Sequence, residues 1–445
     1  MIEPQAELAE VLSEGRRQFL AGRLDLAVAA YKNAVDSVPD DFMVQRSAGI
    51  LFLQNKDYQG AAKHLLNALR LNEFDTLTLQ GLTQALSSLP SGGCQLPDGR
   101  QQSSLAKSGA LFVIYDLEAN PCSIGDFLNF LQGAVVVADM YGAQTMDICF
   151  VSNPNNPTTS DLIDLFSNDS RFCHLFSILP ITQLAGRIGS ILIVESLVEA
   201  LGNLGKGYLA LWPNAAQLQC KGYMFYEIMK LCHAYKQHHG DMPRLSCRKS
   251  ALSWAKGFHD AQVSPEILVS VNIRNNPKYA THRNSSLEAW LRFFEDCIGK
   301  YPVKFVVICG TAEVDDRFRQ LGNVLFAKDF STDIEQDLAL IEFSAMHLGS
   351  ASGPATMATF TKKPYLIVNA DMGNYIEHYD GALISESGML HLGFSEQNQR
   401  FGTVPETFEY LADEFKGMWD QLDLSIWHSF MKNIVSSNAP LTWLR

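Results

Sequence analysis

The sequence lacks the features that mark several common classes of protein. Its nine cysteines include no Cys-x-x-Cys pair, which argues against a disulfide framework or a structural zinc site. The net charge of −13 argues against general binding to nucleic acid or to an anionic membrane surface. The most apolar run, Ile188–Leu201, is too short to span a bilayer. Residues 1–14 carry no basic side chain, unlike a secretory signal, so we expect a cytoplasmic protein.

Two nucleotide-binding motifs are also missing. No Gly-x-Gly-x-x-Gly follows the first predicted strand, and no Walker lysine loop occurs, which disfavours dehydrogenases and nucleoside triphosphatases. His233, His238 and His239 do not recur at a spacing that would hold a metal. The chain is 445 residues long, 47% hydrophobic and 19% charged, which predicts a folded protein of two or three domains.

The first 75 residues contain a repeat. Residues 8–41 and 42–75 align at a spacing of 34. Small residues recur where two helices would approach closely, and large ones recur where they would fill the gap between helix pairs. The matched positions are Gly15 and Gly49, Phe19 and Leu53, Leu24 and Tyr58, Ala27 and Ala61, Tyr31 and Leu65, and Ala34 and Ala68.

This period and pattern resemble the tetratricopeptide repeat. The first repeat has Val11 where an aromatic residue is usual, and the second has Glu73 where proline is expected. A third helix, Asp75–Leu89, is predicted to cap the stack. Residues 1–90 would then either brace the next domain or bind a partner protein on their concave face, and the sequence favours neither. A polar linker follows at 91–108.

The rest of the chain alternates strands and helices, which predicts parallel sheets. The stretch 205–255 is rich in aromatic residues and is interpreted as helical core. Strands are predicted at Ala110–Tyr115, Met146–Val151, Ile267–Ile273, Lys304–Cys309, Asn323–Phe326, Ala345–Gly349 and Pro364–Asn369, and helices at Phe127–Ala138, Leu287–Ile298 and Ile334–Phe343. Residues from about 405 are helical by pattern, with Phe408, Leu411, Phe415, Trp419 and Leu422 on one face.

Asp126 lies in the loop that follows the first predicted strand. Ligands of parallel sheets bind at such loops, beyond the carboxyl ends of the strands. Asp126 is therefore a candidate general base facing a cleft. The spacing by itself favours a helix-capping carboxylate.

A second candidate site lies at the end of a later strand. Ser350, Ser352 and Gly353 form a small-residue turn, and Pro354 suits the first position of a helix. Backbone N–H groups at such a helix start can bind a phosphate.

Arginines are predicted at the same edge of this sheet. Arg274 follows the strand Ile267–Ile273, and Arg283 and Asn284 follow in the same loop. An arginine facing a phosphate-binding turn can hold a diphosphate without a metal.

These residues resemble motifs of GT-B glycosyltransferases. The turn Gly349–Pro354, followed by Lys363-Pro364, resembles the diphosphate loop of the family. Ser123-Ile124-Gly125-Asp126 resembles the first-strand loop of bacterial heptosyltransferases, in which the aspartate would deprotonate the acceptor hydroxyl. The Arg274 and Arg283-Asn284-Ser285 pattern resembles an uncharacterised branch of bacterial glycosyltransferases that often carry tetratricopeptide repeats. Ala351, Ser352 and Ala355 depart from the heptosyltransferase pattern, so a heptose donor is not expected.

The resemblance implies an α/β fold of two Rossmann-like domains preceded by a short all-α tetratricopeptide segment. The domains would be 109–258 for the acceptor and 259–404 for the nucleotide sugar, with helices in 405–445 packing back on the body. The implied activity is sugar transfer from a nucleotide-sugar donor to a glycan or protein hydroxyl. No metal or other cofactor is expected, in agreement with the lack of a clear Asp-x-Asp motif.

The implied catalytic residue is Asp126, and the implied donor-binding residues are Arg274, Arg283, Asn284, Ser350, Ser352, Gly353 and Pro354. Two alternatives stay open: a tetratricopeptide interaction protein with an inactive glycosyltransferase-like body, and another nucleotide-dependent enzyme such as a sugar-nucleotide epimerase.

Overall fold

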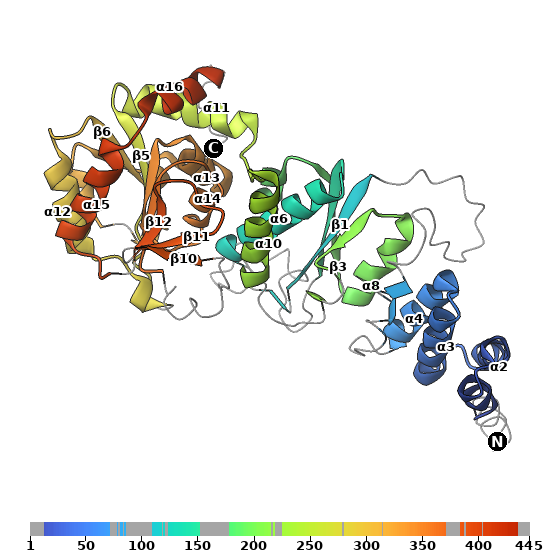
Figure 1. Cartoon of the computed structure of the whole chain (residues 1–445). Coiled ribbons are helices and arrows are strands. Elements are labelled where there is room, and N and C mark those ends of the chain that lie inside the picture. Colours follow the sequence, from blue (N-terminus) through green and yellow to red (C-terminus); the bar gives the residue numbers. More distant parts are fainter. Residues whose placement is uncertain are drawn as a thin grey trace. The chain divides into compact units, whose positions relative to one another are not determined.

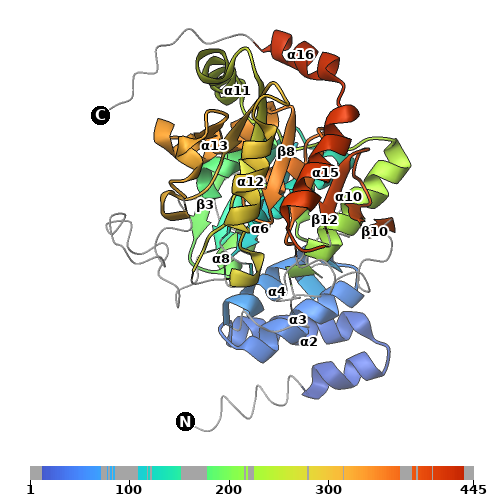
Figure 2. The same ribbon diagram turned by 90° about the vertical axis from the view of Figure 1, so that its left-hand side faces the viewer.

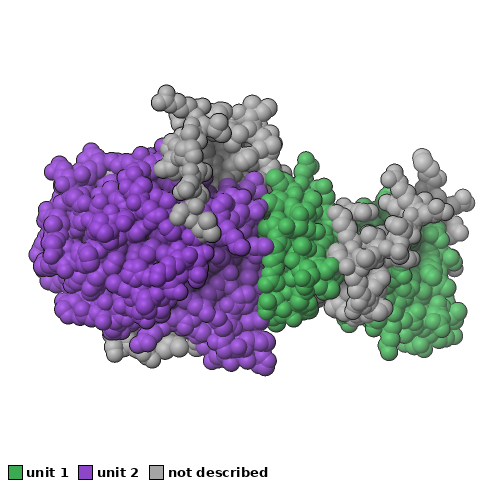
Figure 3. All heavy atoms as spheres, turned by 90° about the horizontal axis from the view of Figure 1, so that it is seen from above, with its two compact units in different colours: residues 1–120, 137–166, 187–222 green, residues 121–136, 167–186, 223–445 purple. Residues whose placement is uncertain are grey.

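The computed structural model describes residues 13–71, 78, 81–82, 84–85, 109–117, 119–120, 123–151, 178–214, 217–218, 225–277, 280–313, 315–370, 383–386, 389–402 and 404–434. The chain divides into two compact units (Figure 3). Unit 1 holds Met1–Asn120, Val137–Phe166 and Arg187–Gly222, and unit 2 holds Pro121–Val136, Ser167–Gly186 and Tyr223–Arg445. The predicted linker at 91–108 lies outside the described residues. The predicted domain boundaries stay predictions.

Unit 1 begins with antiparallel helices (Figure 1). Residues 13–20 are helical and are followed by α2 (Leu24–Ser37), α3 (Phe42–Gln54) and α4 (Tyr58–Leu71). A Cβ atom on Gly15 would lie 2.7 Å from the Tyr31 ring, and one on Gly49 would lie 2.5 Å from the Leu65 side chain. The two contacts are equivalent in the predicted repeat, so the small-to-large packing recurs as expected. Of the predicted third helix, residues 78, 81–82 and 84–85 are described, and they are helical.

The sheet of unit 1 has the strand order β3-β2-β1-β4, with every pairing parallel. Its strands are β1 (Ala110–Asp116), β2 (Thr145–Val151), β3 (Ile188–Val194) and β4 (Ala210–Trp212). Helix α6 (Ile124–Met140) connects β1 to β2, and α8 (Leu197–Gly202) follows β3. The continuous apolar run of β1 is almost wholly buried, as expected for a central parallel strand.

The sheet of unit 2 has the order β10-β11-β12-β9-β8-β5-β6-β7. Its strands are β5 (Ile267–Asn272), β6 (Val303–Val307), β7 (Val324–Phe326), β8 (Met346–Ser350), β9 (Tyr365–Val368), β10 (Leu383–Glu386), β11 (Met389–Leu392) and β12 (Gln399–Gly402). The β10–β11–β12 pairings are antiparallel and the others are parallel. With the β10–β11 hairpin set aside, the strands follow the Rossmann order 3-2-1-4-5-6. The prediction of two Rossmann-like α/β bodies after an all-helical segment is therefore confirmed.

Several helices of unit 2 pack against one another. Helices α12 (Leu287–Cys297) and α15 (Phe408–Asp420) lie side by side (Figures 1 and 2), with the Phe293 and Phe415 rings 5.4 Å apart. Helix α11 (Lys249–Phe258) packs against α13 (Ile334–Phe343). Helix α16 (Leu424–Asn433) is joined to α13 by the Trp427 indole, which donates to the Phe343 carbonyl at 2.8 Å. The predicted apolar face of the last helices is thus partly buried within unit 2, at Leu411 and Phe415.

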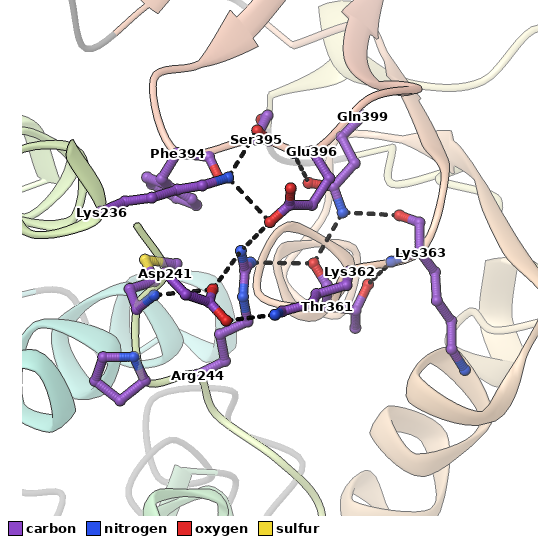
Figure 4. A network of polar contacts seen from close by, with 12 residues as sticks. Lys236, Asp241, Arg244, Thr361, Lys362, Lys363, Phe394, Ser395, Glu396 and Gln399 are labelled. Carbon is purple, nitrogen blue, oxygen red and sulfur yellow. Dashed lines mark hydrogen bonds and ion pairs between the residues drawn. The ribbon is translucent and has the colours of Figure 1, made fainter. Parts of the chain in front are cut away.

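Helix α10 (Phe225–His239) is fixed by a polar network (Figure 4). The Lys236 ammonium donates to the carbonyls of Phe394 and Ser395 and to the Glu396 carboxylate. The Arg244 guanidinium donates to Glu396 at 2.7 Å and to the Thr361 carbonyl at 3.2 Å. This network ties α10 and the segment after it to the loops beside β9 and β12.

The described residues also include short helical turns and the helix α14. They are η2 (Leu179–Ala185), η3 (Asn203–Lys206), the π-helical η4 (His259–Val263), η5 (Thr281–Arg283), η6 (Thr311–Glu313), η7 (Phe318–Gln320), η8 (Ala327–Phe330) and α14 (Thr356–Thr359). Within the described ranges, no helix combines the length and apolar character needed to cross a membrane.

The interpretation of 205–255 as helical core is only partly correct. Residues 225–239 and 249–258 are helical, whereas Ala210–Trp212 is the edge strand β4. Three residues are too few for a strand to show its alternation in the sequence. Pairing with β1 selects the extended backbone here.

Candidate functional site

The polar residues predicted for the donor site converge where the strand order of the unit 2 sheet reverses. The reversal lies between β5 and β8, because β6 and β7 follow β5 on one side and β9 follows β8 on the other. In open α/β sheets ligands bind in the crevice beyond the carboxyl ends of the strands at this point. Arg274 lies two residues beyond β5, and Ala351 directly follows β8.

Gly349 allows β5 and β8 to meet closely at this edge. Its φ angle is +145°, and a Cβ atom there would lie 2.3 Å from the Asn272 carbonyl oxygen. That distance is a backbone clash that no rotamer change could relieve. The glycine is therefore required for the close strand approach that brings the two strand ends together.

The turn after β8 differs from the prediction. Thr356, Met357 and Ala358 donate their N–H groups to the carbonyls three residues earlier, so residues 353–358 form tight turns. The helix is only Thr356–Thr359, and it begins two residues after Pro354. The prediction that Pro354 is the first residue of the helix is wrong, because Pro354 lies in the turn before Thr356. So short a helix has little dipole, which removes that part of the argument for phosphate binding.

Arg283 anchors the turn. Its Nε and Nη2 atoms donate to the Ala351 carbonyl oxygen at 3.3 and 2.7 Å. A guanidinium has five N–H donors, so the two bonds leave three for other acceptors. Ser352 and Gly353 follow in the partly exposed turn, where the Ala355 N–H is 3.5 Å from the Ser352 hydroxyl.

Arg274 and Asn284 lie in one loop that the structure holds closed. The Arg274 N–H donates to the Ser285 hydroxyl at 3.1 Å, and the Arg274 carbonyl accepts from the Ser285 N–H at 2.7 Å. The Asn284 amide accepts from the Asn276 N–H at 3.0 Å and donates to the Asn276 carbonyl at 2.8 Å. The side chain of Asn284 is thus used to close the loop.

Ser350 is buried in a network that includes two residues the sequence did not single out. Its hydroxyl lies 2.7 Å from that of Ser285, 3.3 Å from Asn369 Nδ2 and 3.4 Å from Glu406 Oε1. Burial raises the pKa of the Glu406 carboxyl, and hydrogen bonds to it partly oppose that shift. Asn369 could have been found as the polar residue at the end of a predicted strand. Glu406 had no sequence signal, because it lies in the short loop before α15.

Asp126 is the third residue of α6. Its N–H donates to the Ser123 hydroxyl at 3.2 Å, and that hydroxyl donates to Asp126 Oδ2 at 2.5 Å. The residue that caps the helix is therefore Ser123, and the Asp126 carboxylate is held by it. One carboxylate oxygen of a partly exposed side chain is used in this way.

Two glycines bring the Asp126 motif against the turn after β8, both within unit 2. A Cβ atom on Gly125 would lie 3.3 Å from Gly353 Cα, and one on Gly353 would lie 3.3 Å from the Gly125 nitrogen. The two backbones thus pass close to each other, and the side chains of Ile124 and Thr356 also lie at this contact. The sequence predicted each motif separately, and the structure places them side by side.

The roles of these residues stay predictions, as does independence from metal. In the part of the chain that the structure describes, no group of three or more His, Cys, Asp or Glu side chains gathers as metal ligands would.

No protein-family model matches this chain. No curated protein matches it either. Among solved structures, it is similar to the ADP-heptose LPS heptosyltransferase II of E. coli, at 11% identity and a TM-score of 0.42, covering 70% of this chain and 99% of that one. It is similar to a family 9 glycosyl transferase of Veillonella parvula, at 11% identity and a TM-score of 0.40, covering 70% and 97%.

A third similarity, to an O-GlcNAc transferase mutant of Thermobaculum terrenum, covers 97% of this chain and 93% of that one, at 10% identity and a TM-score of 0.27. None of the three TM-scores reaches 0.5, so the assignment of the fold rests on the strand order itself.

Proposed function

We propose that this chain is a metal-independent glycosyltransferase that moves a sugar from a nucleotide-sugar donor to an acceptor hydroxyl. The observation that carries the proposal is the backbone contact between Gly125 and Gly353. It brings a candidate base, Asp126, beside the turn at the switch point of a Rossmann-ordered sheet, where nucleotides bind in such folds.

The donor half of the reaction needs fixed positive charge. As the bond from the anomeric carbon to the diphosphate breaks, negative charge grows on the leaving phosphate. Arg274 at the end of β5 would donate to that phosphate. The three N–H groups of Arg283 that are not bonded to Ala351 would do the same. Small residues in the turn, Ser352 and Gly353, would let the diphosphate approach the backbone.

The acceptor half needs a base. Asp126 would take the proton of the acceptor hydroxyl as its oxygen attacks the anomeric carbon. Ser123 fixes the carboxylate through one oxygen, which orients the other. The acceptor would be a glycan or a protein hydroxyl, and the protein would act in the cytoplasm.

The N-terminal helices fit the same proposal as tetratricopeptide pairs. The repeated contacts of Gly15 with Tyr31 and of Gly49 with Leu65 support that assignment. Residues 1–90 would either bind a protein partner or brace the enzyme, and both alternatives stay open.

The proposal is tested by calorimetry with a panel of nucleoside diphosphates and their sugars. We expect at least one to bind, and the Arg274→Ala variant to bind it more weakly by about 1.5–3 kcal/mol, the range for hydrogen bonds to charged groups. Arg317→Ala is the matched control, because Arg317 pairs with Asp315 and Glu288 on the surface of the same unit. Failure of the whole panel to bind would overturn the proposal, and equal binding by the Arg274 variant would remove Arg274 from the site.

A further inference from the structure

The Glu406 carboxylate accepts hydrogen bonds from four donors on three segments of unit 2. Oε1 accepts from Trp290 Nε1 at 2.6 Å and from the Ser350 hydroxyl at 3.4 Å. Oε2 accepts from the Ser286 N–H and from Asn369 Nδ2 at 3.3 Å. The donors come from the start of α12 and from the ends of β8 and β9, which are the segments that surround the switch point.

Only a carboxylate can satisfy this set of donors. The Trp290 indole N–H and the Ser286 backbone N–H are donors that cannot accept, and each faces a different oxygen. An amide in place of the carboxylate would put its NH₂ group against one of them in either orientation. The site therefore demands two acceptors, and a glutamine would leave two donors facing each other in a half-buried place.

A chain of hydrogen bonds runs from Glu406 to the predicted donor-binding segments. The Arg274 N–H donates to the Ser285 hydroxyl, which lies 2.7 Å from the Ser350 hydroxyl. Ser350 in turn donates to Glu406 Oε1. Because Glu406 can only accept, it sets the direction of the whole chain. It thereby links the strand end that carries Arg274 to the strand end that carries the turn at Ala351.

We infer that Glu406 is a positioning residue that fixes the distance between Arg274 and the turn after β8, and so sets the affinity for the donor diphosphate. The inference rests on the proposed function. Glu406 itself need not touch the donor, because both of its oxygens are used inside the protein.

The test compares Glu406→Gln with Glu414→Gln by calorimetry, using the nucleoside diphosphate that the wild type binds. Glu414 is a matched control, because it is a partly buried carboxylate of the adjacent helix α15 that pairs with Arg400, away from the switch point. We expect the Glu406 variant to bind about tenfold more weakly or worse, and the Glu414 variant to stay within about twofold of wild type. Binding is measured well below the melting temperature of each variant. In turnover, the Glu406 change should raise KM for the donor far more than it lowers kcat.

A rescue tests whether the facing donors cause the loss of affinity. Trp290→Phe removes the donor that faces Oε1, so the Glu406→Gln amide can be accommodated. The double variant should therefore bind more tightly than Glu406→Gln alone.

Ser285→Ala provides a second test that does not depend on the Glu406 variant folding. It breaks the chain between Arg274 and Ser350 while leaving the other contacts of Glu406 intact, and it should weaken binding severalfold. Wild-type affinity in folded Glu406→Gln, or in Ser285→Ala, would overturn the inference. If the wild type binds no nucleoside diphosphate, the proposed function fails and the inference fails with it.

Discussion

The two sheets share a strand order but differ in the charge of the loops at their carboxyl ends. In unit 1 the order β3-β2-β1-β4 reverses between β1 and β4, as the unit 2 sheet reverses between β5 and β8. Residues 117–120, after β1, and 213–220, after β4, contain no lysine or arginine. The loop after β5 contains Arg274 and Arg283. The same reversal of strand order thus occurs in both sheets, and of these loops the one after β5 carries the fixed positive charge that a diphosphate needs.

The largest expected effect concerns the strand approach that builds the unit 2 crevice. Gly349→Ala puts a Cβ atom against the Asn272 backbone and should destabilise the protein by more than about 4 kcal/mol, or prevent folding. Gly207→Ala is the control in unit 1, because Gly207 also has positive φ (+78°) but nothing would lie within 4 Å of its added Cβ atom. It should cost about 1–2 kcal/mol, the penalty for left-handed backbone alone. If urea denaturation gave similar losses of unfolding free energy for the two variants, the contact between β5 and β8 at Gly349 would not be the cause of the larger expected effect.

The next effect concerns Asp126, which decides whether the contact between the two motifs is catalytic. Asp126→Asn keeps an oxygen that can accept from Ser123, so stability should change little. If Asp126 is the general base, its replacement should lower the rate of sugar transfer by about 10²–10⁴-fold. Asp139→Asn is the control on the same helix, because Asp139 pairs with Arg187 at the surface. A normal rate in Asp126→Asn would leave Asp126 with only its role at the helix start.

Acid should loosen the N-terminal helices of unit 1 through His64. Burial lowers the pKa of His64 from 6.5 to about 4, so the folded helices hold it neutral. Above pH 6.5 the folded and unfolded states are both neutral. Between pH 6.5 and 4 the unfolded state binds the proton and the folded state does not. The free energy of unfolding therefore decreases as the pH is lowered, by about 1.4 kcal/mol per pH unit, or about 3 kcal/mol in all.

Hydrogen exchange of α3 and α4 measures this loss without requiring unfolding of unit 2. His64→Gln removes the titrating group, so the free energy of opening, obtained from exchange after correction for the intrinsic rate, should depend less steeply on pH in the variant between 6.5 and 4. Parallel pH profiles for wild type and variant would rule out His64 as the cause. Exchange in the β5–β8 region of unit 2 is the internal reference.

The smallest effect concerns the start of α6. Ser123→Ala removes the hydroxyl that binds both the N–H and the carboxylate of Asp126 and should cost about 0.5–2 kcal/mol of stability. If the hydroxyl also orients the base, kcat should fall while donor affinity stays the same. An unchanged kcat would confine Ser123 to capping.

Local patterns in the sequence were enough to predict the elements and much of their order. Apolar runs such as Ile267–Asn272 and the capping pattern before Ile334–Phe343 span only a few residues, so a strand and a helix could be placed almost to the residue. The repeat at 34 residues likewise predicted which positions in the N-terminal helices would be small and which would be large. Arg274 and the turn after β8 were found because each follows a recognisable strand.

The contacts between those elements depend on the tertiary structure. The short strand β4 takes its conformation from pairing with β1. The helix after Pro354 has only four residues and follows tight turns. The contact of Gly125 with Gly353 and the bonds of Ser286 and Trp290 to Glu406 join residues more than a hundred positions apart. Periodicity and capping act over a few residues, whereas such contacts depend on the strand order, which no local pattern encodes.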